Sequence, residues 1–467
     1  MGHHNISRRK FLGQASCAGL GYTTLLSTLV NLKSINAASI LNSTTIDCGG
    51  YKAMVCLLLE GGADSFNMLI PRGDSEWQQY ATTRSNNAIP KNDILGINPT
   101  ESVGKDLGVH PAMSNMRDMF NNGEMAFISN IGSLINGVSK DDIYSGTADL
   151  PLGLFSHADQ VMHWQTGVPQ DRVAQGWGGK IADMMYACNS NQNISLNVSL
   201  GGSNLFQTGN QSIEFSIDPY NGSTMINGYG EEWQFAQMRT QAIDNMMDAY
   251  YDDMFKKSFV DIIKVGKEGA EQFNAAIDSI ELNTPFTDNY LSQSFHMVAK
   301  TIAARSALGM SRQIFFINYG GWDHHDEVLM AQQEMLTEVD TALGEFNAAM
   351  KELNIHNDVL TFSMSEFGRT LTSNGNGTDH AWGGNVFIMG GDVNGQKVYN
   401  GYPDLALNSN IEIGGGVLIP SMSVDEYFSE IAMWFGVPSS ELTTLFPNIG
   451  NFYSPGSGNP IGFLDMV

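Results

Sequence analysis

A short acidic stretch with two histidines, GGWDHHDE (residues 320–327), could bind a metal ion. Neutral imidazoles and carboxylates are the usual protein ligands of zinc, manganese and iron. Because His324 and His325 are adjacent, their side chains point in different directions, so at most one of them is expected to share a metal ion with Asp323. The alternative interpretation is a solvated loop, or a helix cap made by Asp323.

A second polar stretch, SEFGRTLTSNGNGTDHAWGGN (residues 365–385), directly follows an apolar run. Asp379 and His380 lie close to glycines, which let a backbone approach a ligand closely, so they could be a ligand pair or a histidine oriented by a carboxylate. Arg369 offers a fork that matches a sulfate or phosphate group, and Glu366 adds a carboxylate. An Asx turn at Asp379 and a salt bridge at Arg369 are the alternatives.

Ser156, in LFSHADQVMHWQTG (residues 154–167), stands at the predicted start of a helix. A serine there commonly caps the helix. A helix N-terminus also stabilises an anion, however, and a nearby metal ion could activate the hydroxyl as a nucleophile. Both roles stay open. His157 and His163 follow on the same helix, and His163 is expected to pack in the interior.

Apolar runs precede the acidic stretches and predict buried strands, as in a parallel sheet covered on both faces. The runs are residues 51–59, 125–131, 314–319, 359–364 and 386–389. Three of them continue into glycine-containing turns that carry Asp64, Asp323 or Glu366. Ligands bind outside the carboxyl ends of the strands in an open α/β sheet. We therefore expect these three acids at one edge of the sheet.

Helical patterns alternate with the predicted strands. They cover residues 234–275, 331–353 and 425–437. This alternation predicts an α/β fold with a mostly parallel sheet. The simplest organisation is one large domain over residues 39–467 with a helical insertion near 230–310.

The composition favours a large soluble protein that is not drawn to polyanions. The chain has 467 residues, of which 42% are hydrophobic, which is enough for a sizeable core. Asp and Glu number 49 against 24 Lys and Arg, for a net charge of −25. Such a charge argues against binding nucleic acid or an anionic membrane electrostatically, and it suits cation binding.

The first 38 residues are predicted to be an export signal. NISRRKFLG (residues 5–13) places an arginine pair before a mildly apolar stretch, and small residues for cleavage follow near Ala37 or Ala38. The segment resembles a twin-arginine signal, which implies a periplasmic or secreted protein with no membrane span in the mature chain. A general secretory signal or a basic N-terminal helix is the alternative.

Three cysteines remain after the predicted cleavage, and none of them forms a CxxC motif. A thiolate zinc site is therefore not expected. Cys56 lies in an apolar run and is interpreted as a buried thiol. Cys48 and Cys188 could pair in an oxidising compartment, and their pairing stays open.

Several stretches together resemble one protein family. They are LLLEGGADSFNMLIP, GVHPAM, FSHADQVMHWQTG, NYGGWDHHDE, SEFGRTLTSNGNGTDHAWGGN and EIAMWFGVPSSELTTLFPNI. With them the chain resembles the twin-arginine-exported bacterial proteins grouped as a domain of unknown function in the alkaline phosphatase and sulfatase-like superfamily. The resemblance implies an alkaline-phosphatase-like three-layer sandwich, two divalent metal ions at the strand ends, and hydrolysis or transfer of phosphate or sulfate esters.

The resemblance also implies roles for single residues. Asp64 matches the first metal-binding aspartate, and Ser156 falls where the nucleophile is expected. Asp323 and His325 match the central metal ligands, and His380 matches the last metal-binding histidine.

The sequence departs from that superfamily at two neighbouring positions. Glu366 and Phe367 stand where relatives have Asp and His, so one imidazole ligand is missing. Asp379 and His324 are the candidate replacements. The formylglycine motifs Cys-x-Pro-x-Arg and Ser-x-Pro-x-Arg are not found in the sequence, so a formylglycine sulfatase is not expected.

The expected function is that of an exported metal-dependent hydrolase acting on phosphate or sulfate esters. One or two ions of zinc, manganese or calcium are expected. The ligand sets are Asp323, His325 and His380 for one ion, and Asp64 and Glu366 for the other. The second ion would lower the pKa of Ser156 or of a water, and Arg369 would hold the anionic group of the substrate.

Two other classes of function stay open. One is a non-catalytic secreted binding or scaffold protein on a degenerate hydrolase fold, which the missing histidine at Phe367 favours. The other is a structural calcium protein, which would use oxygen ligands without histidine. The expected partner is a small anionic ester, nucleic acid is not expected, and protein partners are left open.

Overall fold

The structure is a computed structural model that describes residues 46, 48–223 and 229–466. The predicted export signal, residues 1–38, lies outside the described residues.

The described chain divides into two compact units. The larger unit comprises the described residues of 46–224 and 272–467, and the smaller comprises those of 225–271. Each unit is described by itself.

A nine-stranded sheet forms the centre of the larger unit. Its strand order is β11-β5-β10-β9-β1-β8-β6-β7, and β12 pairs with β5. The strands are β1 (Lys52–Leu58), β5 (Met125–Gly132), β6 (Asn197–Ser199), β7 (Phe215–Ser216), β8 (Arg312–Asn318), β9 (Val359–Met364), β10 (Gly384–Gly390), β11 (Val398–Tyr399) and β12 (Met422–Ser423). Among these strands only β10 runs antiparallel to its neighbours β5 and β9. The predicted α/β class with a mostly parallel sheet is confirmed, and each of the five predicted apolar runs forms a strand.

The three strands that precede the acidic turns are neighbours in the sheet. β1 pairs in parallel with β8 on one side and with β9 on the other. Leu58, near the end of β1, is in register with Asn318 of β8 and Met364 of β9. The turns after these strands therefore leave the sheet at the same edge, as the sequence predicts.

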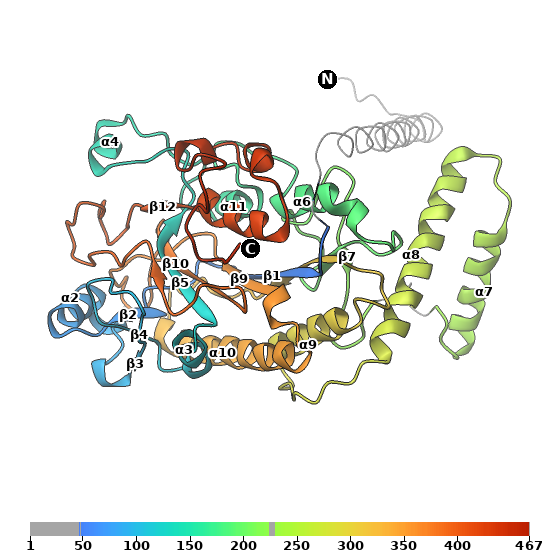
Figure 1. Cartoon of the computed structure of the whole chain (residues 1–467), viewed down its shortest axis with the longest axis horizontal. Helices are drawn as coiled ribbons and strands as arrows, with labels where there is room; N and C mark the ends of the chain where they lie inside the picture. The colour runs from blue at the N-terminus through green and yellow to red at the C-terminus, as the bar shows by residue number, and fades with distance from the viewer. Residues whose placement is uncertain (1–45, 47, 224–228, 467) are drawn as a thin grey trace, which may run out of the picture. The chain divides into compact units, whose positions relative to one another are not determined.

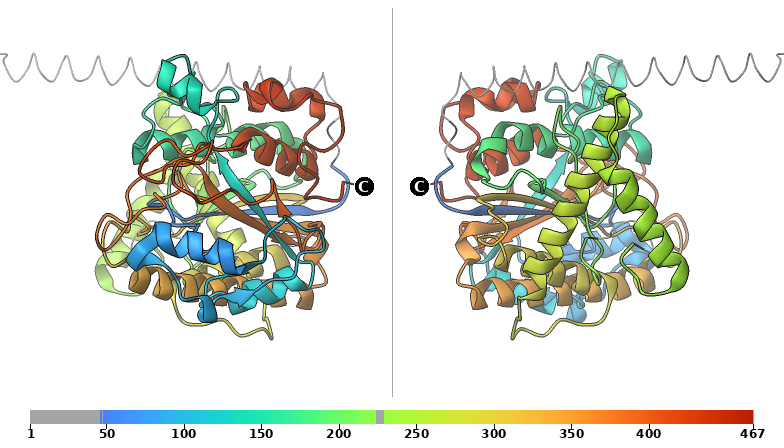
Figure 2. Two further views of the ribbon diagram at one scale, coloured as in Figure 1. Left: turned by 90° about the vertical axis from the view of Figure 1, so that its left-hand side faces the viewer. Right: turned by 90° about the vertical axis from the view of Figure 1, so that its right-hand side faces the viewer.

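Helices cover both faces of the sheet, because the side chains of each buried strand alternate between two apolar layers. In β1, Val55 and Leu57 face one layer, and Met54 and Cys56 face the other. The first layer is closed by α3 (Ser114–Asn121), α9 (Tyr290–Ala303) and α10 (Val328–Glu352), and the second by α6 (Trp177–Met185), α11 (Val424–Phe435) and α12 (Leu442–Leu445). Figures 1 and 2 show the strands between these two groups of helices.

The helices of the larger unit agree with the sequence patterns where these exist. They are α2 (Asp74–Arg84), α3 (Ser114–Asn121), α4 (Lys140–Ser145), α5 (His157–Thr166), α6 (Trp177–Met185), α9 (Tyr290–Ala303), α10 (Val328–Glu352), α11 (Val424–Phe435) and α12 (Leu442–Leu445). The final amphipathic helix is α11, and its apolar side chains pack in the second layer as expected. A small second sheet is formed by β2 (Leu69–Pro71), β4 (Leu107–Val109) and β3 (Leu95–Gly96).

The smaller unit is helical. It contains α7 (Gln234–Asp248) and most of α8 (Met254–Asp278), separated at residues 249–253. The sequence predicts one helical pattern over residues 234–275 and an insertion near 230–310; in the structure this range holds α7, α8 and α9. Within the described part of the chain, no helix is long and apolar enough to cross a membrane.

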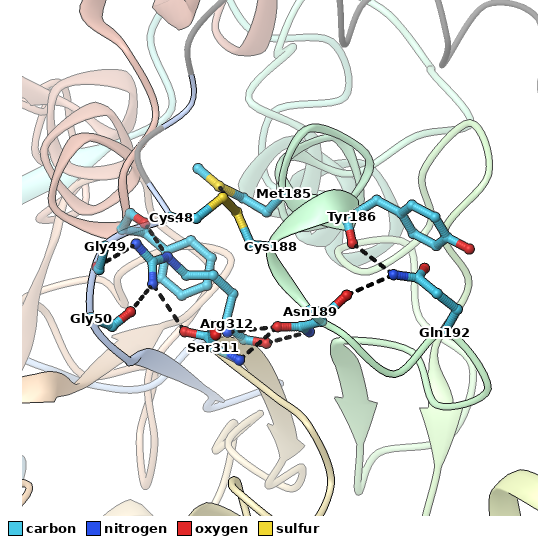
Figure 3. Close-up of a disulfide and its surroundings, with 11 residues drawn as sticks. Cys48, Gly49, Gly50, Met185, Tyr186, Cys188, Asn189, Gln192, Ser311 and Arg312 are labelled. Carbon is cyan, nitrogen blue, oxygen red and sulfur yellow. Dashed lines mark hydrogen bonds between the residues drawn. A yellow bond between two sulfur atoms is a disulfide. The ribbon is translucent and has the colours of Figure 1, made fainter.

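A disulfide joins Cys48 to Cys188 across 140 residues of sequence. It fixes the segment before β1 next to the short 3-10 turn that follows α6 (Figure 3). Arg312 strengthens the same corner, because its guanidinium donates to the carbonyls of Gly49 and Gly50. Cys56 is a buried free thiol, as the sequence predicts.

Candidate functional site

The turns after β1, β8 and β9 meet because Gly61 has no side chain. Its φ is +127°, and a Cβ there would lie 2.5–2.8 Å from backbone atoms of Trp322 and Asp323. The Gly61 N–H donates to both carboxylate oxygens of Glu366, at 2.9 and 3.1 Å. A glycine in the first turn therefore allows the second turn to pack against it, and its backbone holds the acid of the third.

His157, Asp323 and His380 form a cluster that could hold a metal ion. One ligand atom from each lies within 4.8 Å of the other two. The Nε2 atoms of His157 and His380 are 3.0 Å apart. The Asp323 carboxylate lies 3.3 Å from His380 Nε2 and 3.5 Å from His157 Nε2.

His325 joins the same cluster from the turn after β8. Its Nε2 lies 3.0 Å from His380 Nε2 and 3.1 Å from Asp323 Oδ1. The neighbouring His324 points into the interior, where its ring packs against Trp322. Of the two adjacent histidines, His325 thus faces Asp323.

The other ring nitrogen of each clustered histidine faces an acceptor. The Nδ1 partners are Glu366 Oε1 at 2.7 Å for His157, Asp379 Oδ1 at 3.2 Å for His325, and the Phe155 carbonyl at 2.8 Å for His380. An acceptor at Nδ1 favours the tautomer that carries its proton there. Metal-binding histidines are commonly oriented by a carboxylate or a backbone carbonyl in this way.

These residues fit a bound divalent metal ion. With the proton on each Nδ1, the Nε2 lone pairs of His157 and His380 face the Asp323 carboxylate, and the Nε2 lone pair of His325 lies beside His380 and Asp323. These groups would repel one another without a cation. Three nitrogen ligands and one oxygen ligand suit zinc, manganese or iron. Calcium prefers sites made of oxygen ligands, so this donor set does not fit it.

Arg369 lies beneath Asp323 and is buried. Its guanidinium donates to Asp323 Oδ1 at 2.7 Å and to the carbonyl and hydroxyl of Thr378. Partial burial works against ionisation of Asp323, but the Arg369 bond and charge outweigh it and lower the pKa of this carboxyl. Arg369 is predicted to hold a substrate anion; in the structure its side chain is fully buried and bonded to the protein.

Glu366 is fully buried and acts on His157. Its hydrogen bond raises the pKa of His157 above the ordinary value, against the opposing effect of partial burial. Glu366 is predicted as a direct metal ligand; the structure places its oxygens against Gly61 N–H and His157 Nδ1. Asp379 is likewise placed behind His325, with its carboxylate exposed.

Asp64 does not join the cluster. Its carboxylate is fully buried and ion-paired with the equally buried Arg84 of α2. Arg84 also donates to the Thr370 carbonyl at 3.0 Å. Asp64 thus bonds Arg84 and Glu366 bonds His157 in this structure, and their predicted role as the ligand set of a second metal ion stays a prediction.

Ser156 is the N-cap of α5. Its hydroxyl accepts from the Asp159 N–H at 3.4 Å, which is a long bond, and the residue is half-buried. Chain neighbours on both sides belong to the cluster: His157 is a candidate ligand, and the Phe155 carbonyl holds His380. The cap is thus observed, and the serine also lies on the segment that builds the cluster.

Sequence reasoning passed over His157. The signal is its position directly after Ser156, which the resemblance gives as the place of the nucleophile. Arg84 was also missed, since nothing in the sequence relates it to Asp64, 20 residues away.

A comparison with known families matches most of the chain. Residues 51–413 match the family described as "Protein of unknown function (DUF1501)". The chain belongs to the DUF1501 family. No curated protein matches this DUF1501 protein.

Solved structures with a similar arrangement include a sulfatase, an alkaline phosphatase and a lipoteichoic acid synthase. They include the PsFucS1 sulfatase from Pseudoalteromonas sp. (11% identity, 86% of this chain and 71% of that chain, TM-score 0.32). Another is the alkaline phosphatase from the Antarctic bacterium TAB5 (12% identity, 75% and 94%, TM-score 0.29). A third is the lipoteichoic acid synthase LtaP from Listeria monocytogenes (8% identity, 92% and 80%, TM-score 0.30).

In this DUF1501 protein, Phe367 packs where the resemblance leads one to expect a histidine ligand. Its buried ring lies 4.9 Å from the ring of His157 and 4.7 Å from that of His380, measured between centroids. The Phe367 ring therefore packs against the rings of two candidate ligands. His157, from α5, brings an imidazole to the cluster from a different element.

Proposed function

We propose that this protein is an exported hydrolase of phosphate or sulfate esters that uses one divalent transition-metal ion. The observation that carries the proposal is the convergence of three histidine Nε2 atoms on the Asp323 carboxylate, with every Nδ1 facing an acceptor. A surface group of histidines and acids has no need of such matched orientation, whereas a metal site does.

The chain's own residues have distinct roles in this proposal. His157, His325, His380 and Asp323 would hold the ion, which would polarise an ester oxygen and make a nearby hydroxyl or water more acidic. Glu366 orients the His157 ring through Nδ1. Arg369 fixes the Asp323 carboxylate and, with its charge, keeps it ionised.

Ser156 is the proposed nucleophile. Its half-buried hydroxyl precedes His157 directly; it accepts from the Asp159 N–H at 3.4 Å and also bonds the Asp159 carboxylate, whose pKa is lowered by the Arg172 hydrogen bond and by this one. Attack by Oγ on phosphorus or sulfur would form a seryl ester and release the alcohol, which takes up the serine proton. Water would then cleave the seryl ester and restore the hydroxyl.

Export to an oxidising compartment is part of the proposal. The Cys48–Cys188 disulfide supports it, because structural disulfides persist mainly in secreted and periplasmic proteins. The arginine pair in residues 5–13 of the sequence supports the twin-arginine route.

Elemental analysis of the protein purified from the periplasm without added metal tests the proposal. We expect about one equivalent of a transition metal, lost in His157→Ala and in His380→Ala. His296→Ala is the matched control, because it removes an imidazole of α9 that stacks on Phe286 outside the cluster. Metal content equal in all four proteins would refute the assignment of the ligands.

Activity on aryl phosphates and aryl sulfates forms the second half of the test. Ser156→Ala should retain the metal and lose at least a hundredfold in kcat if the serine is the nucleophile. A variant that keeps both metal and turnover would leave Ser156 as a helix cap only, worth about 1 kcal/mol of stability.

A non-catalytic binding or scaffold role is the second candidate. It is favoured by the Asp64–Arg84 ion pair and by the buried Arg369, which leave fewer groups to face a substrate. Protein that contains the metal but hydrolyses no phosphate or sulfate ester would support this role.

A further inference from the structure

Across the described segments that build the candidate metal centre, the solvent-facing side carries acids and no exposed lysine or arginine. Asp323 and Asp379 are 45% and 60% exposed, and Asp326 and Glu327 are exposed on the turn after β8. The described segments that build the centre are residues 60–67, 153–163, 319–328 and 365–384. Across these segments Arg369 is the sole lysine or arginine, and it is buried.

Two other guanidinium groups near these segments are already neutralised. Arg84 is buried in its ion pair with Asp64. Arg172 reaches Asp159 of α5 at 2.7 Å. A substrate anion would therefore meet the charge of the metal ion without help from a free arginine fork.

The charges of the loaded centre cancel. A divalent ion and Arg369 contribute three positive charges, and the carboxylates of Asp323, Glu366 and Asp379 contribute three negative ones. The exposed acids Asp326 and Glu327, on the same turn as Asp323 and His325, then add two negative charges. A second charge on an incoming anion would be repelled, and the repulsion is strong where a low-dielectric wall limits screening.

We infer that this site accepts tetrahedral esters with a single negative charge, namely phosphodiesters or sulfate monoesters, and discriminates against doubly charged phosphate monoesters. The inference rests on the proposed function. It follows from the carboxylates around the centre and from the burial of Arg369. It therefore concerns which ester binds, and not how the bound ester is cleaved.

Exposed apolar side chains on the loop that leads to the site indicate the character of the ester's organic group. Leu150, Leu152 and Phe155 are 40%, 38% and 37% exposed on the loop that leads into α5. The Phe155 carbonyl bonds His380, so this residue lies at the cluster itself. Its φ of +72° is rare for an aromatic residue, and the loop thus holds an exposed phenyl group next to the centre in an unfavourable backbone conformation. An apolar organic group would cover these side chains.

Binding of a matched pair of unreactive analogues tests the inference without relying on turnover. The probes are phenylphosphonate, a dianion at pH 8.5, and its monomethyl ester, a monoanion, added to the metal-loaded protein in a calorimeter. We expect the monoanion to bind at least tenfold more tightly. Equal or tighter binding of the dianion overturns the inference and leaves the proposed function standing.

Charge-neutral variants check the cause of the preference. Asp326→Asn combined with Glu327→Gln should reduce the ratio of monoanion affinity to dianion affinity severalfold. Glu101→Gln is the matched control, because Glu101 pairs with Lys397 before β11, at the opposite edge of the sheet, and should leave the ratio unchanged. An unaltered ratio in the double variant would contradict the electrostatic explanation.

Measured turnover shows which of the two monoanionic esters, the phosphodiester or the sulfate monoester, is the better substrate. The Phe155→Ala variant tests the contribution of the apolar side chain. Methyl 4-nitrophenyl phosphate and 4-nitrophenyl sulfate are compared with 4-nitrophenyl phosphate, and one of the first two should have the highest kcat/KM. Phe155→Ala should weaken binding of the monomethyl ester of phenylphosphonate more than it weakens binding of methyl methylphosphonate. If protein with one bound metal binds none of the analogues, the proposed function itself fails.

Discussion

Each clustered histidine has a hydrogen-bond acceptor at its Nδ1 atom, and this acceptor determines that Nε2 is the nitrogen free to bind a metal ion. A free imidazole rotates and exchanges its proton between two nitrogens, whereas Glu366, Asp379 and the Phe155 carbonyl each fix one nitrogen. Glu366 is the strongest of these partners, because it is fully buried and bonded to Gly61 N–H as well as to His157. The groups that accept hydrogen bonds from the candidate ligands therefore support the assignment of a metal site as strongly as the ligands do.

Glu366→Gln should weaken metal binding while preserving the fold. The amide oxygen can still accept from Gly61 N–H, but the charge that makes His157 a better ligand is lost. We expect the metal dissociation constant to rise by roughly 10–100-fold. Competition with a chromophoric chelator measures this directly.

A variant with the same charge change elsewhere serves as the reference. Glu101→Gln alters an exposed ion pair with Lys397 and should leave the dissociation constant within experimental error of the wild type. If both variants bind metal as the wild type does, Glu366 does not support the site through His157.

At the scale of elements, the site depends on three neighbouring parallel strands ending at one level. β9, β1 and β8 deliver their turns to the same edge, and α5 brings His157 to it from the second layer. Phe367 and Gly61 let these segments approach. The disulfide fixes the chain at the entry to β1, the strand at the centre of this group.

Cys188→Ser should lower stability without altering the metal site. The disulfide closes a loop of 140 residues, so its loss releases chain entropy in the unfolded state. We expect the free energy of unfolding to fall by about 2–4 kcal/mol, measured by denaturant titration in oxidising buffer. Reductant should lower the free energy of unfolding of the wild type to that of the variant and leave the variant's value unchanged. If reductant does not change the wild-type value, the disulfide is absent.

On the scale of the whole molecule, the cluster connects parts of the chain that are far apart in sequence. His157, Asp323 and His380 span more than two hundred positions, so an ion bound to them links segments that separate on unfolding. Binding to the folded chain alone stabilises it by mass action. The metal is thus expected to act as a structural clamp as well as a reactive centre.

Thermal unfolding should therefore respond to zinc, and the response should depend on pH. Zinc at a hundred times its dissociation constant adds about 2.7 kcal/mol to the free energy of unfolding. In the metal-free protein, the His157–Glu366 pair stabilises the fold below the ordinary histidine pKa and ceases to do so as the pH rises through the raised pKa of His157. Zinc competes with that proton, so the zinc-induced rise in Tm should shrink as the pH falls through the raised pKa. A rise that is the same at pH 5.5 and pH 8 would exclude His157 as a ligand.

Much of the architecture was accessible from the sequence, because it depends on local patterns. Continuous apolar runs predicted β1, β5, β8, β9 and β10, since strands buried on both faces have no polar side to alternate with. The common edge for Asp64, Asp323 and Glu366 followed from the parallel arrangement. The resemblance of several short motifs pointed to the family that the match over residues 51–413 shows.

The sequence by itself determined which residue types reach the sheet edge, because strand ends and turns are fixed by neighbours in the chain. The tertiary structure decided which of them face one another, because that depends on contacts between residues hundreds of positions apart. It paired Asp64 with Arg84, turned Arg369 inward to Asp323, and brought His157 from α5 to the cluster. It also joined Cys48 to Cys188, a pairing that the sequence left open. Buried charges require partners, and only the packed chain determines which partners lie within reach.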